Sequence, residues 1–259
     1  MDLNFSIDKK GRAFYSLNFH DKAVILNSGL GFILKDNVEW MKIDTLDMMN
    51  NFKILNVTFD SVDEYWNPVW GEESEIRNNY NEMFVELQQI ESERKVNIRF
   101  RLFDDSLGFR YEFPLQEKLG SFIIIDEKTE FAMAGDHTAM WIPGDYDTQE
   151  YNYTTSKLSE IEQKSIEFRE ENVSMYRFSN WAVQTALMMK SQNGLYINIH
   201  EAALIEYSAM HLEFNPVNMT FESHLTPDAY GNMAYMNACL LYTSPSPRDV
   251  EECRMPSSA

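Results

Sequence analysis

The chain has 259 residues, of which 44% are hydrophobic and 14% aromatic, enough for a packed core in one large domain or two small ones. Its 22 basic and 41 acidic residues give a formal charge of −19, which argues against nucleic-acid binding, because phosphate contacts need a concentrated basic surface. No stretch approaches the roughly 18 consecutive apolar residues of a membrane span, and the first residues lack the charged and apolar regions of a signal peptide.

Short runs of alternating apolar and polar residues recur along the chain and predict β-strands separated by turns. In chain order they occupy residues 13–19, 24–26, 31–34, 52–59, 84–87, 95–114, 122–125 and 195–200. The clearest is 95–114, where Asp104-Asp105-Ser106 separates two alternating runs and predicts a hairpin with one buried face. Residues 157–172 are polar, Glu-rich and without a regular apolar stripe, and predict a surface loop or a short helix. Many strands and few helices indicate an all-β, antiparallel sandwich.

Composition is even over residues 1–238, which we interpret as one domain, and then changes to Pro and Ser in residues 239–259. Residues 239–249 resemble one reading frame of a transposase sequencing adaptor, and residues 254–259 resemble the same frame after a short gap. We therefore expect an adaptor-derived, disordered tail; the alternative is an ordinary Pro/Ser tail. Both cysteines, Cys239 and Cys253, lie in this tail, so residues 1–238 have no thiol chemistry.

Common catalytic motifs are incomplete. Gly29-Leu30-Gly31 lacks the third glycine of a dinucleotide-binding loop, and no phosphate-binding loop or Gly-x-Ser-x-Gly pattern occurs. The segment HEAAL at residues 200–204 begins like the helix of a zinc protease, but Leu204 stands where the second histidine would be. The sequence therefore does not support either a dinucleotide-dependent enzyme or a zinc protease.

Three longer segments point elsewhere: WNPVWGEESEIRNNY at residues 66–80, FAMAGDHTAMWIP at 131–143 followed by Asp145-Tyr146, and GLYINIHEAAL at 194–204. Together with the hairpin at 95–114, their order and spacing resemble the N-terminal domain of glycoside hydrolase family 97 over nearly all of residues 1–238. The resemblance implies an antiparallel β super-sandwich. In complete members a (β/α)₈ barrel and a small β-domain follow, so we expect an incomplete protein.

The resemblance also implies a function. Members are bacterial, calcium-dependent and mostly exported enzymes that act on α-linked sugars; one branch comprises inverting α-glucosidases and another retaining α-galactosidases. Glycoside hydrolysis needs an acid and a second carboxylate, and in this family both belong to the barrel. We therefore assign no catalytic residue here and expect the chain to be inactive alone. The implied partners are an α-linked oligosaccharide and the missing barrel, and the implied location is the periplasm or exterior.

Glu201 resembles the one calcium ligand that the family's sandwich contributes. Ca²⁺ prefers several carboxylate and carbonyl oxygens, so we expect it only in the complete protein, where glutamates of the barrel would join Glu201. The alternative for Glu201 is a solvated acid at the end of a strand. His200 is interpreted as a structural neighbour, because calcium rarely binds imidazole.

Aromatic residues leave a second function open. Trp66, Trp70 and Trp141 have apolar faces suited to stacking on sugars, although tryptophans in a sandwich are more often core residues. The alternative function is therefore a self-standing carbohydrate-binding module without catalysis, in which exposed tryptophans would bind the sugar. Asp136 and His137 are interpreted as a polar turn and not as an acid/base pair.

Overall fold

The computed structural model describes residues 1–36, 45–167, 177–202, 204–205 and 207–236, which form five antiparallel sheets and little helix. None of the described helices is long and apolar enough to cross a membrane. Two helical turns, η1 (Leu158–Glu160) and α1 (Ile161–Glu167), follow β13. The strands are β1 (Asp2–Ile7), β2 (Ala13–Phe19), β3 (Lys22–Leu30), β4 (Phe32–Asp36), β5 (Thr45–Met48), β6 (Phe52–Trp66), β7 (Ile76–Gln89), β8 (Lys95–Leu102), β9 (Leu107–Glu112), β10 (Phe122–Glu127), β11 (Glu130–Ala132), β12 (Thr138–Trp141), β13 (Thr154–Lys157), β14 (Ala182–Gln184), β15 (Leu187–Lys190), β16 (Tyr196–Ile199), β17 (Met210–Asn215), β18 (Thr220–Leu225) and β19 (Ala234–Met236).

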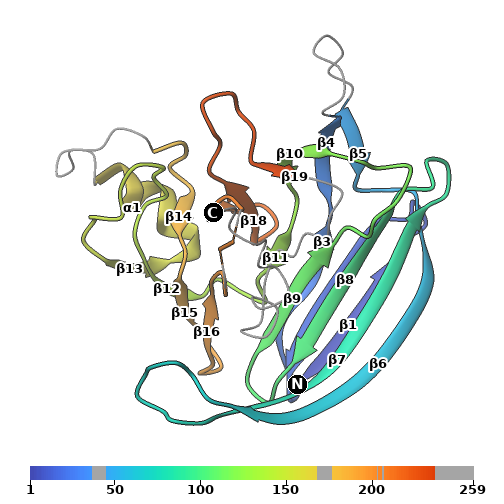
Figure 1. The fold of residues 1–259 in the computed structure, drawn as a ribbon. Coiled ribbons are helices and arrows are strands. Elements are labelled where there is room, and N and C mark those ends of the chain that lie inside the picture. Colours follow the sequence, from blue (N-terminus) through green and yellow to red (C-terminus); the bar gives the residue numbers. More distant parts are fainter. Residues whose placement is uncertain (37–44, 168–176, 203, 206, 237–259) are drawn as a thin grey trace.

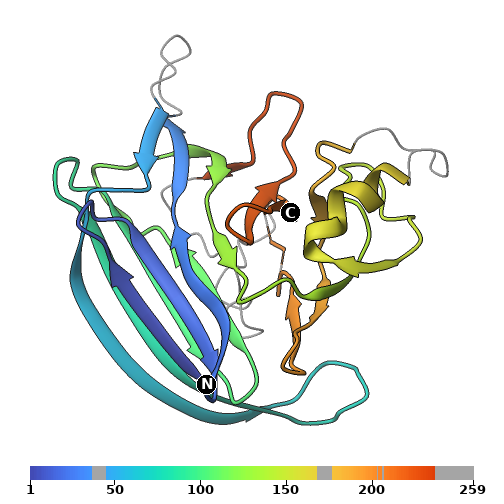
Figure 2. The ribbon, with the colours of Figure 1, turned by 180° about the vertical axis from the view of Figure 1, so that it is seen from behind.

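The sheets are arranged as a β super-sandwich. The sheets with strand orders β1–β2–β3 and β6–β7–β8–β9 face each other and form one curved half of the molecule (Figure 1). The sheets β11–β18–β17–β14 and β13–β12–β15–β16 lie beside that half, together with α1, as the view from behind also shows (Figure 2). The sheet β19–β10–β4–β5 covers one end. The predicted all-β, antiparallel architecture is confirmed.

Aromatic side chains fill the space between the two facing sheets. The ring of Tyr15 on β2 lies 6.3 Å from the ring of Phe100 on β8 and 5.3 Å from that of Phe109 on β9, measured between centroids. Phe5 on β1 also approaches Phe100, at 5.9 Å. Because alternate residues of a strand point to the same face, these rings all enter the core while their neighbours point outward. The tilted contacts add to the hydrophobic gain of burying each ring.

Glu130 clamps β11 to the first sheet. Its Oε1 accepts a hydrogen bond from Arg12 Nη2 at 2.6 Å, and its Oε2 accepts one from the backbone N–H of Gly29 at 2.7 Å. The hydroxyl of Tyr15 donates to the Glu130 carbonyl at 2.9 Å. A Cβ on residue 29 would lie 2.3 Å from Arg12 Nη2 and 2.8 Å from Glu130 Oε2. The clamp therefore requires glycine at position 29.

A buried hydrogen-bond network surrounds Glu127 at the end of β10. Thr129 Oγ1 donates to Glu127 Oε1 at 2.6 Å, and the hydroxyl of Tyr207 donates to Oε2 at 2.5 Å. The Tyr111 hydroxyl on β9 lies 2.8 Å from Thr129 Oγ1. Burial raises the pKa of the Glu127 carboxyl, and the bonds from Thr129 and Tyr207 oppose that shift. The network joins β9 and β10 to the segment before β17.

The predicted elements agree with the structure where alternation is strong. The run at residues 13–19 is β2, and the hairpin at 95–114 is β8 and β9 with its apolar face in the core. The expected short helix is η1 with α1, although residues 168–172 lie outside the described residues. The domain end at residue 238 and the adaptor-like residues 239–259 also lie outside them, so both stay predictions.

The Glu130 clamp can be tested through stability. Glu130→Ala removes two charge-assisted hydrogen bonds and leaves Arg12 without its carboxylate, so the free energy of unfolding should fall by about 2 kcal/mol. Urea unfolding measures this change. Glu162→Ala, at an exposed position on α1, is the control and should alter the value by less than about 0.5 kcal/mol. Equal effects of the two changes would mean that the clamp contributes nothing.

Glu127 predicts a pH-dependent difference in stability. An acid whose pKa is raised by folding stabilises the fold fully below its unfolded-state pKa, near 4.5, and loses this contribution as pH rises through the folded-state pKa. Glu127→Gln keeps the shape and cannot ionise. The stability of Glu127→Gln relative to wild type should therefore increase between about pH 4 and about pH 7. Urea unfolding at both values measures it, and a constant difference would contradict the buried acid.

Candidate functional site

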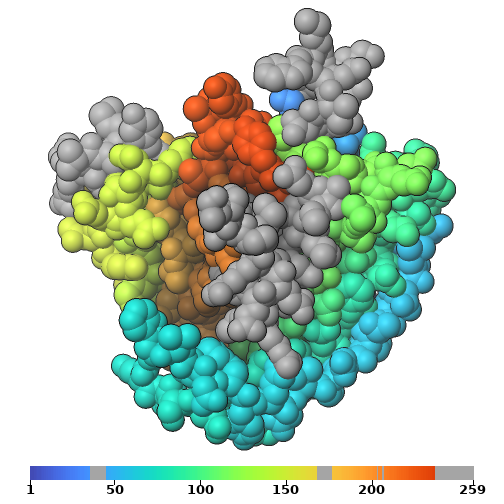
Figure 3. Space-filling model, viewed as in Figure 1, coloured from blue at the N-terminus to red at the C-terminus, as the bar shows by residue number. Residues whose placement is uncertain are grey.

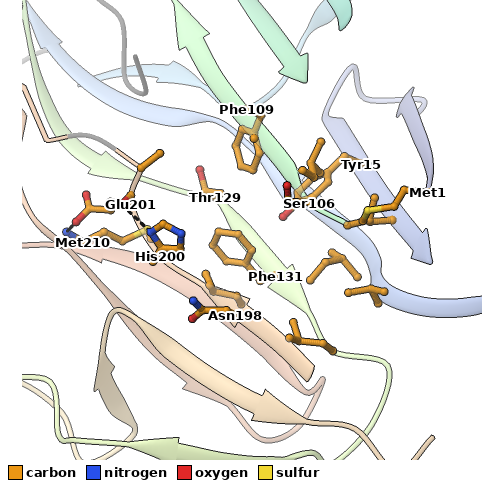
Figure 4. Close-up of a pocket in the computed structure, with 18 of the residues that line it drawn as sticks. Met1, Tyr15, Ser106, Phe109, Thr129, Phe131, Asn198, His200, Glu201 and Met210 are labelled. Carbon is orange, nitrogen blue, oxygen red and sulfur yellow. Dashed lines mark hydrogen bonds between the residues drawn. The ribbon is translucent and has the colours of Figure 1, made fainter. Parts of the chain in front are cut away.

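A cavity of about 610 Å³ opens between β2, β3, β9, β11 and β16. Tyr15, Phe109 and Phe131 line its apolar side, and the residues around the end of β16 line the other (Figure 4). Its size is in the range of ligand sites, and its mainly apolar wall with a few polar groups at one end is typical of them. Strands from several sheets therefore position this site.

Glu201 lies at the polar end of the cavity, two residues after β16 ends at Ile199. The side chain is half-buried, and its Oε2 accepts a hydrogen bond from the backbone N–H of Met210, the first residue of β17, at 3.0 Å. Burial raises the pKa of the Glu201 carboxyl, while the Met210 N–H and the charge of His200 act in the opposite direction. Glu201 is therefore held at the cavity and is not a freely solvated acid.

His200 is exposed and bonds only locally among the described residues. Its Nδ1 donates to the carbonyl oxygen of Glu201 at 2.9 Å, so the ring nitrogen facing Glu201 is occupied by backbone. The contact supports the interpretation of His200 as a structural neighbour of Glu201.

Glu127 is a second carboxylate on the same cavity, and sequence reasoning did not single it out. The charge of Glu201 adds to the burial that raises the pKa of Glu127. Both Glu127 oxygens accept hydroxyl hydrogen bonds, whereas Glu201 Oε1 accepts none from the described residues. The available signal was the pair of acids, Asp126 and Glu127, that follows the apolar run at residues 122–125.

The geometry around Glu201 fits one ligand of a hard cation. A carboxylate with one oxygen fixed by a backbone N–H and the other open to a cavity presents a preoriented oxygen. Among the residues that the structure describes, no three His, Cys, Asp or Glu side chains gather closely enough to hold a metal ion. Glu201 thus fits as a single contributor, and further oxygens would have to come from elsewhere.

The three tryptophans have different environments. Trp141 is 1% exposed and its Nε1 donates to Ser156 Oγ at 3.0 Å, which confirms a core role. Trp66, the last residue of β6, is partly buried. Trp70 is 89% exposed in the loop between β6 and β7, so the core interpretation is wrong for this residue. The neighbouring loop residues Glu72, Glu73 and Glu75 are exposed and do not bury the Trp70 ring.

Asp136 and His137 do not form an acid/base pair. The carboxylate of Asp136 accepts bonds from the backbone N–H of Ser159 at 3.0 Å and from its hydroxyl at 2.8 Å, and so fastens η1. His137 is buried, neither ring nitrogen has a hydrogen-bond partner among the described residues, and burial lowers its pKa. These contacts agree with a polar turn.

Known proteins share this architecture and sequence. The family model described as "Glycosyl-hydrolase 97 N-terminal" matches residues 1–245. A retaining alpha-galactosidase of Bacteroides thetaiotaomicron is 22% identical over 223 residues, which are 82% of this chain and 29% of that protein. A family 97 enzyme of Pseudoalteromonas sp. strain K8, solved in complex with acarbose, is 31% identical with a TM-score of 0.76, over 93% of this chain and 32% of that one.

A β-arabinopyranosidase structure shares the fold at 16% identity, with a TM-score of 0.73 over 93% of this chain and 37% of its own. The chain thus spans about a third of the length of these relatives. The family match extends over nearly the whole chain, and the fold aligns with the Pseudoalteromonas structure over 93% of it. This chain belongs to glycoside hydrolase family 97, within which it corresponds to the N-terminal domain.

Proposed function

We propose that this chain is the non-catalytic N-terminal domain of a calcium-dependent, exported α-glycosidase, to which it contributes a calcium ligand, Glu201, and part of the pocket wall. The observation that supports this role is the half-buried carboxylate of Glu201, fixed by Met210 at the edge of a large cavity with one oxygen open. Calcium bound there would supply positive charge beside an α-linked sugar. The part of the protein beyond this chain would provide the other ligands.

The relatives favour an α-linked oligosaccharide as the substrate. The curated relative is named a retaining alpha-galactosidase, and the Pseudoalteromonas enzyme was solved with acarbose and, as an E480Q variant, with panose. Hydrolysis of such a glycosidic bond needs a pair of carboxyl groups, one on each side of the bond. Glu127 does not fit this role, because it is buried and both oxygens are bonded inside the fold. The catalytic pair therefore belongs to the portion that this chain lacks.

Exposed Trp70 favours a second candidate, a self-standing carbohydrate-binding module. Such a module would bind sugar without any further domain, by stacking the ring on a pyranose face. The two candidates differ in what the isolated chain does with an oligosaccharide.

The isolated chain should lack glycosidase activity on aryl α-glucosides and aryl α-galactosides, because the proposed function places the catalytic acid and its partner carboxylate outside this domain. Release of the aryl alcohol after stringent purification measures this. Turnover abolished by Glu201→Gln or Glu127→Gln would place the catalytic groups in this domain.

Panose binding by the isolated chain, detected calorimetrically and lost in Trp70→Ala, would favour the binding module.

Glu201 is tested in a chimera that joins residues 1–238 to the remaining part of the Pseudoalteromonas enzyme. Glu201→Gln keeps the side chain's size and removes its charge, so the calcium concentration that gives half-maximal activity should rise at least about tenfold. Activity should return when calcium is raised.

Glu162→Gln, on exposed α1 away from the cavity, is the matched control and should leave the half-saturating concentration unchanged. Equal calcium dependence in wild type and Glu201→Gln would remove the metal role. Calcium titration of the chimera followed by calorimetry provides a readout independent of turnover.

A further inference from the structure

The hairpin of β6 and β7 extends well past the sandwich. Strand β8 pairs with β7 only as far as the pair Asn81–Leu102, whereas β6 and β7 remain paired from Val62–Tyr80 to Trp66–Ile76. Residues 62–80 therefore form a two-stranded arm with its loop at residues 67–75. In Figures 1 and 2 the arm runs along the lower side of the molecule, and its loop lies below β16. Two-stranded ribbons are marginally stable alone, so an arm of this length needs support.

Polar contacts hold the arm in one shape. Arg77 makes a bidentate ion pair with Asp63 across the two strands, with both N–O distances at 2.7 Å. In the loop, Asn67 Nδ2 donates to the carbonyl of Ser74 at 2.7 Å. Exposed ion pairs of this kind contribute little stability, but the two bonds fix the strand register and the loop. The tip is presented as a preformed element.

The tip exposes its apolar residues. Val69 is 99% exposed, Trp70 is 89% exposed and Tyr65, on the adjoining strand, is 59% exposed. The space-filling view shows the hairpin as the lower rim of the molecule (Figure 3). Leaving a valine and a tryptophan in water forgoes the free energy that burial of these apolar side chains would provide. Tryptophan is also the residue most often found at the energetic centre of an interface.

The negative charge of the loop restricts the kind of surface that can bind the tip of the arm. Three acids, Glu72, Glu73 and Glu75, follow Trp70 directly and are exposed. A partner must therefore offer an apolar pocket for Val69 and Trp70 with basic side chains at its rim. A sugar fits less well, because sugar sites are concave, and Trp70 stands on a projecting loop and does not line the 610 Å³ cavity.

We propose that the arm is a docking element whose Val69 and Trp70 insert into an apolar, basic-rimmed pocket on the part of the full-length enzyme that this chain lacks. This inference rests on the proposed function. The chain covers 29% of the curated relative and 32% of the Pseudoalteromonas enzyme, so about two thirds of such a protein is available to cover the tip. An intramolecular partner avoids the entropy cost of association, so two anchor residues are enough.

Glutamyl endopeptidase tests the proposal, because it cuts after the exposed glutamates at positions 72, 73 and 75. The isolated chain should be cut rapidly at these bonds. The chimera should be cut at least about tenfold more slowly, since cleavage requires the arm to leave its pocket first. Mass spectrometry of the fragments gives both rates.

Variants separate docking from folding. In the chimera, Val69→Ser with Trp70→Ser should restore rapid cutting, while the same changes in the isolated chain should leave its melting temperature unchanged. Tyr230→Ser, at an 88% exposed position on another loop, should keep the protection. Hydrogen exchange of residues 67–75 in the chimera and in the isolated chain gives a second measure of protection.

Equal cutting of the chimera and the isolated chain would overturn the docking role. Protection of the isolated chain by panose would overturn it in favour of sugar binding. An active chimera with an unprotected arm contradicts only the docking proposal. A protected arm without any effect of Glu201→Gln on calcium contradicts only the proposed metal role.

Discussion

The contact on which the rest of the domain depends is the carboxylate of Glu130. It accepts from Arg12 and from the backbone of Gly29, and thereby sets how closely β11 can approach the sheet of β1, β2 and β3. The absence of a side chain at position 29 is the steric condition for that approach. Because β2, β3 and β11 also line the cavity, the same contact joins strands that form the wall of the candidate site.

The two carboxylates of the cavity illustrate how environment assigns roles to identical groups. Glu127 and Glu201 both lose solvation, and burial raises the pKa of each. Glu127 is bonded through both oxygens by Thr129 and Tyr207 and belongs to the scaffold. Glu201 is fixed through one oxygen and keeps the other available. A buried acid whose bonds are all internal rigidifies a site, and a half-bonded one can still accept a ligand.

Sequence reasoning identified the architecture because alternation is strong where one strand face enters the core, as in β2 and in the hairpin of β8 and β9. It ended β6 at residue 59, whereas the strand continues to Trp66. Beyond residue 59 the inner face, with Val62, Glu64 and Trp66, is only partly buried and includes a glutamate, so the apolar–polar alternation is weak. Glu201 was found through a resemblance extending over many residues. Glu127 was missed, because its importance lies in Thr129, Tyr207 and Tyr111, which come together only in three dimensions.

Strand β6 has a consequence for the domain in isolation. It is the terminal strand of its sheet, so along 15 residues one edge has no strand partner among the described residues. Such an edge is a template for intermolecular pairing and aggregation. A bulge between Ile54 and Asn56 interrupts the regular ladder, and Asp60 places negative charge on the strand. Two copies of β6 would therefore repel each other there at low ionic strength, and salt that screens this carboxylate would weaken the protection.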